Sequence, residues 1–148
     1  MEETAMGREN RTMPIVLMPI KAQFADAILK SKTKEWELRR KAPRIPTPFR
    51  VLLVVSGTGG QIYGEFTCDK ICQFTPREAR NVIDKCGISM REFYGYLGGA
   101  GHMNFLHISN PLDYTKDMSK EDLPNIRQFG YSRTPQTWLY IREKGVTT

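Results

Sequence analysis

The segment that most constrains the fold is Arg50–Val55, whose letters RVLLVV are apolar at every position after the first. Because successive side chains of a β-strand point to opposite faces, a strand of this composition has to be covered on both sides. It therefore predicts a central strand. The glycine-rich letters SGTGG follow and are interpreted as a hairpin turn into a further strand, QIYGEFTCDKI.

Other short runs that are apolar or alternate between apolar and polar residues predict the remaining strands. These lie at Ile15–Ile20, within Ser31–Lys41, at His102–Ile108 and at Gln136–Glu143. Within Ser31–Lys41, Trp36 and Leu38 fall on one face and are expected to point toward the core. Trp138 and Tyr140 are also expected to be core residues, because the last strand completes the sheet.

Three short helices are predicted from hydrophobic stripes and from their start signals. The first covers Lys21–Ser31, with a stripe of Phe24, Ala25, Ile28 and Leu29. The other two open with a capping box, in which a hydroxyl and a glutamate three residues later bond each other's backbone N–H groups; the pairs are Thr75 with Glu78 and Ser89 with Glu92. Gly87 is expected to end the helix that opens at Thr75, after a stripe of Ala79, Val82, Ile83 and Cys86.

Five or six strands and about three helices, without regular strand–helix alternation, argue against a doubly wound parallel sheet. We therefore predict an α+β fold, a small and partly closed β-barrel with the short helices packed against it. Such a barrel leaves a cleft where a helix meets the strands. The 148 residues fit one domain, predicted over residues 14–148 after a flexible N-terminal tail of residues 1–13.

The sequence carries no signal for a membrane, a metal or a cofactor. The first twelve residues lack the order of a secretory signal, and no apolar run approaches the roughly 20 residues that span a bilayer. Cys68, Cys72 and Cys86 form no CxxC pair and have no close histidine ligand pair beside them. We expect a cytoplasmic protein without cofactor, metal or membrane partner. The sequence leaves the oligomeric state open and slightly favours a monomer.

The net charge of +6 is concentrated in one stretch. Between Lys30 and Arg50, eight basic residues face two acidic ones, so this stretch carries the whole excess and the rest of the chain is neutral. A clustered basic surface favours polyanions such as nucleic acid, through counterion release and electrostatic steering. An edge strand protected from aggregation by lysine has the same appearance, and charge alone does not separate the two interpretations.

Within this stretch, Glu37 and Arg39 are two residues apart on a predicted strand and therefore share a face. A carboxylate beside a guanidinium fixes the arginine fork in one orientation, which suits a phosphate or a base edge. Lys34 falls on the opposite face of a regular strand and reaches the same cleft only if the helix-to-strand turn is bulged. The alternative is a surface ion pair worth about 0–1 kcal/mol.

These residues also carry a resemblance to the ASCH domain (activating-signal-cointegrator homology), a branch of the PUA-like superfamily. The family signature G-x-K-x-x-E-x-R is matched by Lys34, Glu37 and Arg39, with Lys32 where glycine is usual. VLLVVSGTGGQIYGEF is similar to the family's strand–turn–strand ending in G-x-F. FLHISNPLDYTKDM resembles its penultimate strand and loop. RTPQTWLYI looks like the closing P-Q-S-W strand, with Thr137 in place of serine.

The resemblance covers residues 14–142 and implies a PUA-like β-barrel with a cleft lined by the lysine, glutamate and arginine. The family is thought to bind RNA or its modified nucleosides in connection with transcription or translation. Some small members are amidohydrolases that remove acyl groups from cytidine, with a lysine at the position of Lys34 and a threonine nucleophile at that of Glu37. A glutamate cannot serve as that nucleophile, although it can act as a general base on water. Other members have been proposed to cut RNA, a role for which Lys34, Glu37, Arg39 and Tyr63 are the candidate set.

We therefore predict an RNA-binding domain that holds a single strand or a modified nucleotide in a basic cleft. The alternative is a ribonuclease or an amidohydrolase acting on acylated cytidine, with catalytic candidates Lys34, Glu37 and Tyr63. The predicted RNA-binding residues are Lys21, Lys32, Lys34, Glu37, Arg39, Arg40, Ser56 and Thr58. Weaker candidates are Lys41, Arg133 and Gln136.

Overall fold

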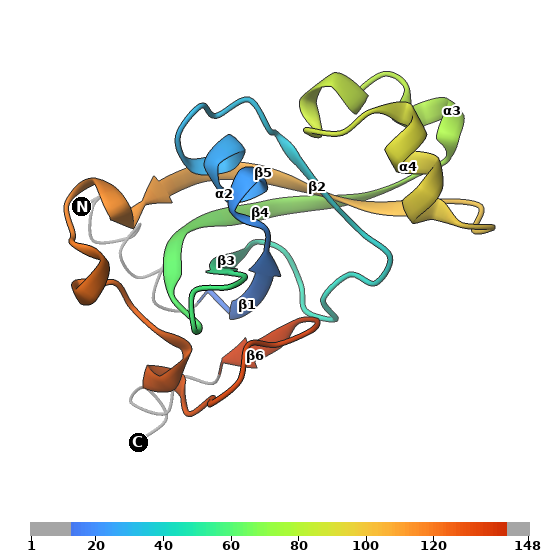
Figure 1. The fold of residues 1–148 in the computed structure, drawn as a ribbon. Coiled ribbons are helices and arrows are strands. Elements are labelled where there is room, and N and C mark those ends of the chain that lie inside the picture. Colours follow the sequence, from blue (N-terminus) through green and yellow to red (C-terminus); the bar gives the residue numbers. More distant parts are fainter. Residues whose placement is uncertain (1–12, 142–148) are drawn as a thin grey trace, which may run out of the picture.

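The computed structural model describes residues 13–141 (Figure 1). The predicted tail lies outside the described residues except for residue 13, and so does the end of the predicted domain, residues 142–148. The strands are β1 (Ile15–Ile20), β2 (Trp36–Arg39), β3 (Phe49–Val55), β4 (Ile62–Phe74), β5 (Met103–Asp113) and β6 (Leu139–Ile141). The α-helices are α2 (Ala22–Leu29), α3 (Pro76–Ala79) and α4 (Met90–Leu97), and the 3-10 helices are η1 (Ile83–Lys85), η2 (Tyr114–Lys116), η3 (Lys120–Asp122) and η4 (Ile126–Phe129).

The prediction that Arg50–Val55 is a central strand is confirmed. The six strands form one sheet in the order β2-β5-β4-β3-β1-β6, so β3 pairs with β1 in parallel and with β4 in antiparallel orientation. Val51, Leu53 and Val55 pack on one face against α2 and β5, whereas Leu52 and Val54 pack on the other face, where η4 covers them. Burial on both faces accounts for the continuous apolar run.

The sheet is mixed and curled into a half-barrel, which confirms the predicted α+β fold with a partly closed β-barrel and short helices (Figure 1). β4 and β5 are its two long strands, and their pairing shifts register between Glu65 and Thr67 and between Cys68 and Ile71. Such bulges bend a strand and increase its twist. The two strands therefore curve around the core, and their far ends carry α3 and α4.

Strand pairing does not close the barrel in the described part of the chain, because β2 and β6 are the edges of the sheet. Three hydrogen bonds bridge the gap instead. Arg39 Nη2 donates to the Pro19 carbonyl at 2.7 Å, and Trp138 Nε1 donates to the Lys41 carbonyl at 2.8 Å. The backbone N–H of Arg44 donates to the Tyr140 hydroxyl at 3.0 Å. We call this line of contact, between residues 39–44 and the β1–β6 edge, the seam.

Both predicted capping boxes are present, at Thr75 and at Ser89, and helix α2 lies where the sequence placed it. The helix that opens at Thr75 nevertheless ends at Ala79 instead of continuing to Gly87. Asparagine followed by two β-branched residues has low helix propensity, and here the chain passes into a turn and η1. The residues Val82, Ile83 and Cys86 still pack in the predicted direction, against a second core cluster formed with Trp36, Phe93 and Phe105.

The strand nearest the C-terminus differs from expectation in one respect. Trp138 is buried as predicted, but Tyr140 has 44% of its surface exposed, so its assignment to the core was wrong. Leu139 and Ile141 pack against the apolar face of β1 and β3, and the alternation of the strand sends Tyr140 the other way, to the seam. β5 also continues to Asp113, through residues predicted to begin a polar connection. Among the described residues, no helix is long and apolar enough to cross a bilayer.

Candidate functional site

A cavity of about 380 Å³ opens at the end of the seam where β1 leads into α2. Its walls come from β1, α2 and β2, which follow one another in the sequence, and from the distant helix α4. Six of the eight predicted RNA-binding residues line it, namely Lys21, Lys34, Glu37, Arg39, Arg40 and Ser56. The fold thus brings together most of the predicted site.

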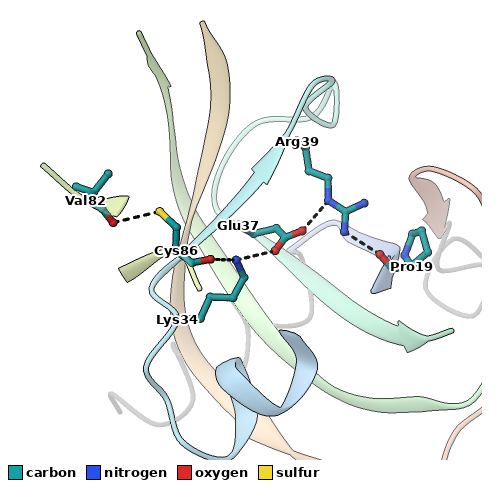
Figure 2. A network of polar contacts seen from close by, with 6 residues as sticks. All are labelled: Pro19, Lys34, Glu37, Arg39, Val82 and Cys86. Atoms are coloured by element: carbon teal, nitrogen blue, oxygen red, sulfur yellow. Dashed lines mark hydrogen bonds and ion pairs between the residues drawn. The ribbon is translucent and has the colours of Figure 1, made fainter. Parts of the chain in front are cut away.

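At the base of the cavity, Glu37 lies between two cations (Figure 2). Its Oε2 accepts from Arg39 Nε at 2.7 Å, which is the predicted pair, and its Oε1 lies 3.3 Å from Lys34 Nζ. Only 8% of the Glu37 side chain is exposed, compared with 24% for Arg39. We call Lys34, Glu37 and Arg39 the pocket triad; it has a net charge of +1.

Lys34 reaches the cavity through an irregular turn. The sequence predicted this placement on the condition of an irregular helix-to-strand turn. β2 begins only at Trp36, so Lys34 belongs to the connection after α2. Lys32 adopts φ +57°, the left-handed conformation that favours glycine, at the position where the ASCH signature usually has glycine. The Lys34 N–H donates back to the Ala27 carbonyl at 3.2 Å, and its Nζ donates to the Cys86 carbonyl. The turn therefore points the side chain inward.

Arg39 is held on three sides. Besides its bonds to Glu37 and to the Pro19 carbonyl, its guanidinium carbon lies 5.6 Å from the centre of the Trp138 ring. A cation over an indole face is attracted by the ring quadrupole. In the described part of the chain no hydrogen bond is made by Arg39 Nη1. The fork is thus oriented before any ligand arrives, with one N–H₂ group available.

Two of the predicted RNA-binding residues and one catalytic candidate lie outside the cavity lining. Thr58 stabilises the β3–β4 turn, since its Oγ1 donates to the Val55 carbonyl at 2.6 Å and accepts from the Gln61 N–H at 3.1 Å. Lys32 is exposed on the α2–β2 connection. Tyr63 is half-buried and packs against the main core.

The fold divides the basic stretch into paired and unpaired residues. Four of its eight cations contact a carboxylate: Lys30 with Asp113, Lys34 and Arg39 with Glu37, and Arg50 with Glu65. The other four have no carboxylate within 4 Å among residues 13–141: Lys32, Arg40, Lys41 and Arg44. The last three follow β2 and lie along the seam, so the unpaired charge extends along the seam from Arg40 in the cavity lining.

Two aromatic side chains in the lining were not predicted as site residues. Phe24 packs against the main core, as its place in the stripe of α2 predicts, and it also lines the cavity, with Lys34 Nζ 5.3 Å from its ring centre. Tyr96 lines the mouth, is 42% exposed, and its carbonyl accepts from Arg40 Nε at 2.7 Å. Tyr96 lies three residues after the buried Phe93, at the border of the buried stripe of α4, so the helical pattern alone did not single it out.

The histidines and cysteines add no second site. His107 Nδ1 lies 2.7 Å from Asp69 Oδ1, beside the Trp36 ring. No group of three or more metal-ligating side chains occurs within the described residues. Burial raises the pKa of the Cys68 and Cys86 thiols to about 12, so both are protonated at neutral pH and are poor nucleophiles.

No protein-family model and no curated protein matches the sequence. The structure does match solved structures of the ASCH protein from Zymomonas mobilis. One crystal structure of a mutant has a TM-score of 0.72 at 16% identity, covering 90% of this chain and 94% of that one. A second mutant gives the same score and identity with 92% of its chain covered, and ASCH itself gives 0.70 at 15% with 91% covered.

This chain has the ASCH-domain fold. The likeness spans nearly the full length of both chains, and the expectation that the sequence motifs raised about the fold is therefore confirmed. At this level of identity it describes the ASCH fold alone. What the cavity of this chain binds has to be argued from its own residues.

Proposed function

We propose that this protein binds RNA and holds one unpaired or modified nucleotide of a single strand in the cavity beside the pocket triad. The observation that carries the proposal is the combination of an oriented charged floor with largely apolar walls. The volume of about 380 Å³ lies in the range of small-ligand sites, about 300–1,000 Å³. Sites of this kind bury the flat part of a ligand against apolar side chains and orient it with a few polar groups.

Each part of the cavity suits a part of a nucleotide. Phe24 and Tyr96 offer aromatic surface for a base, which is the usual way in which proteins hold unpaired RNA bases. Glu37 retains acceptor capacity for an exocyclic amine or an imide N–H, and Arg39 Nη1 is a donor without a partner among residues 13–141. Lys21 and Arg40 lie at the lining without a carboxylate partner in the described residues, and they suit phosphate.

The same contacts argue for binding over the catalytic alternative. Lys34 Nζ already donates to a backbone carbonyl. Tyr63, the remaining member of the candidate ribonuclease set, does not line the cavity.

The direct test is a titration of labelled single-stranded RNA with the intact protein, followed by fluorescence anisotropy at two salt concentrations. We expect measurable binding that weakens steeply with salt, and a loss of roughly 1–3 kcal/mol in Arg39→Ala. Lys116→Gln, which removes an exposed charge on η2 that is not in the cavity lining, is the matched control and should bind as the wild type. Absence of binding, or binding that is insensitive to salt, contradicts the proposal.

The catalytic alternative is tested in parallel. The protein is incubated with labelled single-stranded RNA and, separately, with acylated cytidine, each with and without a chelator. We expect both substrates to remain intact. Product formation that disappears in Glu37→Gln would establish hydrolysis and replace the binding proposal.

A further inference from the structure

A second hollow lies at the opposite end of the seam from the cavity. It has a volume of about 380 Å³ and is lined by Pro14, Ile15, Arg44, Ile45, Tyr140 and Ile141. The two hollows flank the ends of β1, since Pro19 and Ile20 line the first and Pro14 and Ile15 line the second. No acidic residue is among the lining residues of the second hollow.

The connection between the hollows is short and basic. The chain runs from Arg40 in the first lining to Arg44 in the second, and four residues span at most about 14 Å. Arg40, Lys41 and Arg44 have no carboxylate within 4 Å among residues 13–141. The segment is anchored in its middle by the bond from Trp138 Nε1 to the Lys41 carbonyl, which leaves the lysine side chain exposed.

Tyr140 gives the second hollow an aromatic surface that is already positioned. Its hydroxyl accepts from the Arg44 N–H at 3.0 Å, and 44% of the residue remains exposed. An aromatic side chain that is tethered at its hydroxyl and open elsewhere loses little conformational entropy when a base stacks on it. Grooves that bind single strands combine such stacking surfaces with cations that follow the phosphate backbone.

We propose that the second hollow is a second nucleotide subsite of the same RNA-binding surface. The inference rests on the proposed function and deepens it: the ligand is a strand of at least two nucleotides that crosses the seam, not a free nucleotide. One nucleotide occupies the cavity at the pocket triad, the backbone passes Arg40 and Lys41, and a further base stacks on Tyr140 beside Arg44. Tyr140 and Arg44 therefore contribute to affinity for strands and contribute nothing to affinity for a mononucleotide.

The test uses the full chain with two probes, a mixed-sequence single-stranded RNA octamer and the four ribonucleoside 5′-monophosphates. Tyr140→Ala should weaken octamer binding by about tenfold or more, because a stacked base is lost. Tyr140→Phe keeps the ring and should bind the octamer within about twofold of the wild type. Arg44→Gln should weaken octamer binding by a smaller factor and reduce its salt dependence. Mononucleotide affinity should be the same in all three variants.

Lys116→Gln is the charge-matched control, and the thermal unfolding of each variant is measured alongside. If Tyr140→Ala destabilises the fold, the octamer affinity of Arg44→Gln still tests the second subsite, because Arg44 is exposed and its replacement is expected to leave the fold intact. Octamer affinity unchanged in Tyr140→Ala and Arg44→Gln, with Arg39→Ala still impaired, overturns the second subsite and leaves the proposed function standing. Failure of the wild type to bind the octamer overturns both.

Discussion

Two glutamates in this protein each hold an arginine, and their surroundings give them different roles. In the pocket triad, Glu37 lies on the edge strand β2 and contacts Arg39 through a single nitrogen, Nε, at 2.7 Å. On the opposite face of the sheet, Glu65 in β4 is bound by both Nε and Nη2 of Arg50, at 2.8 and 2.7 Å. Arg50 gives both of these bonds to one carboxylate, whereas Arg39 divides its Nε and Nη2 bonds between Glu37 and the Pro19 carbonyl.

A tyrosine also contacts the pair of Glu65 and Arg50. The Tyr114 hydroxyl donates to Glu65 Oε1, and Tyr114 begins η2, which contacts β4. We call Arg50, Glu65 and Tyr114 the sealed cluster. Burial raises the pKa of the Glu65 carboxyl, but the hydrogen bonds from Arg50 and Tyr114 lower the pKa by more, so it lies below its usual value. Neither pocket includes a residue of the sealed cluster, which therefore contributes to stability rather than to binding.

The comparison shows that an acid–arginine pair indicates a binding site only where the fold leaves a hollow beside it. Both arginines belong to the basic stretch, and the sequence alone does not say which of the two pairs lies at a ligand site. Access separates them: β2 is an edge strand next to the seam, and β3 is central.

The largest effect is expected from Glu65→Gln. Removing the carboxylate leaves the partly buried guanidinium of Arg50 without a counter-charge and weakens the bond from Tyr114. We expect the free energy of unfolding to fall by about 2–4 kcal/mol, measured by chemical denaturation. Glu121→Gln, an exposed glutamate on η3, should change it by less than about 0.5 kcal/mol. A Glu65→Gln variant that is as stable as the wild type would show that the cluster is not structural.

The next largest effect is the pH dependence of stability, which arises from the same contacts of Glu65 with Arg50 and Tyr114. Because the folded-state pKa of Glu65 is depressed, the cluster's contribution is complete above the ordinary glutamate pKa of about 4.3 and is lost as pH falls through the folded value. Burial and then Glu65 raise the pKa of Tyr114, so the tyrosine's contribution is complete below about pH 10 and is lost at higher pH. The thermal unfolding temperature, measured between pH 2 and 12, should therefore fall at both the acidic and the alkaline end. Glu65→Gln should flatten the acid limb, and Tyr114→Phe the alkaline limb.

Arg39→Lys should weaken RNA binding by about 1 kcal/mol although it keeps the charge, because an ammonium cannot reproduce the oriented fork. Arg40→Lys is the matched control and should change affinity little, since Arg40 is assigned to phosphate as a point charge. Equal losses in the two variants, measured by anisotropy, would mean that charge alone matters and that the triad does not orient the ligand.

The smallest expected effect concerns salt. Arg40→Gln should reduce the slope of log affinity against log salt concentration by about one, because one phosphate contact is removed. Lys85→Gln removes an exposed cation that pairs with Glu35 and lines neither pocket, so it should leave the slope unchanged. A slope that falls equally in both variants would place the RNA elsewhere on the surface.

Much of the fold could be predicted because its signals are local. The apolar run of β3, the two capping boxes and the period-two pairing of Glu37 with Arg39 each depend on a few neighbouring residues. The sequence predicted that Lys34 faces the cleft only if the preceding turn is bulged. It could not decide this point, because the shape of the turn depends on the left-handed conformation of Lys32.

Other features depend on tertiary contacts that no short window contains. The place of Tyr96 at the cavity mouth depends on how α4 packs against β2 across the curved sheet, and the exposure of Tyr140 depends on β6 being an edge. The separation of the basic stretch into paired and unpaired cations requires partners from two other segments, Asp113 in β5 and Glu65 in β4, in addition to Glu37 within the stretch. Charge density in the sequence therefore overestimated the number of cations available to a ligand.

The most direct test of RNA binding at the pocket triad follows Arg39 and Arg50 in one experiment. In ¹⁵N-labelled protein the Nε–H groups of Arg39 and Arg50 both donate to a carboxylate and are resolvable by NMR, with assignment by Arg39→Lys and Arg50→Lys. On addition of single-stranded RNA, binding at the proposed cavity predicts that the Arg39 resonance shifts in a saturable manner while the Arg50 resonance stays in place. An unmoved Arg39 resonance at RNA concentrations that saturate binding, or a shift at Arg50 in its place, would contradict it.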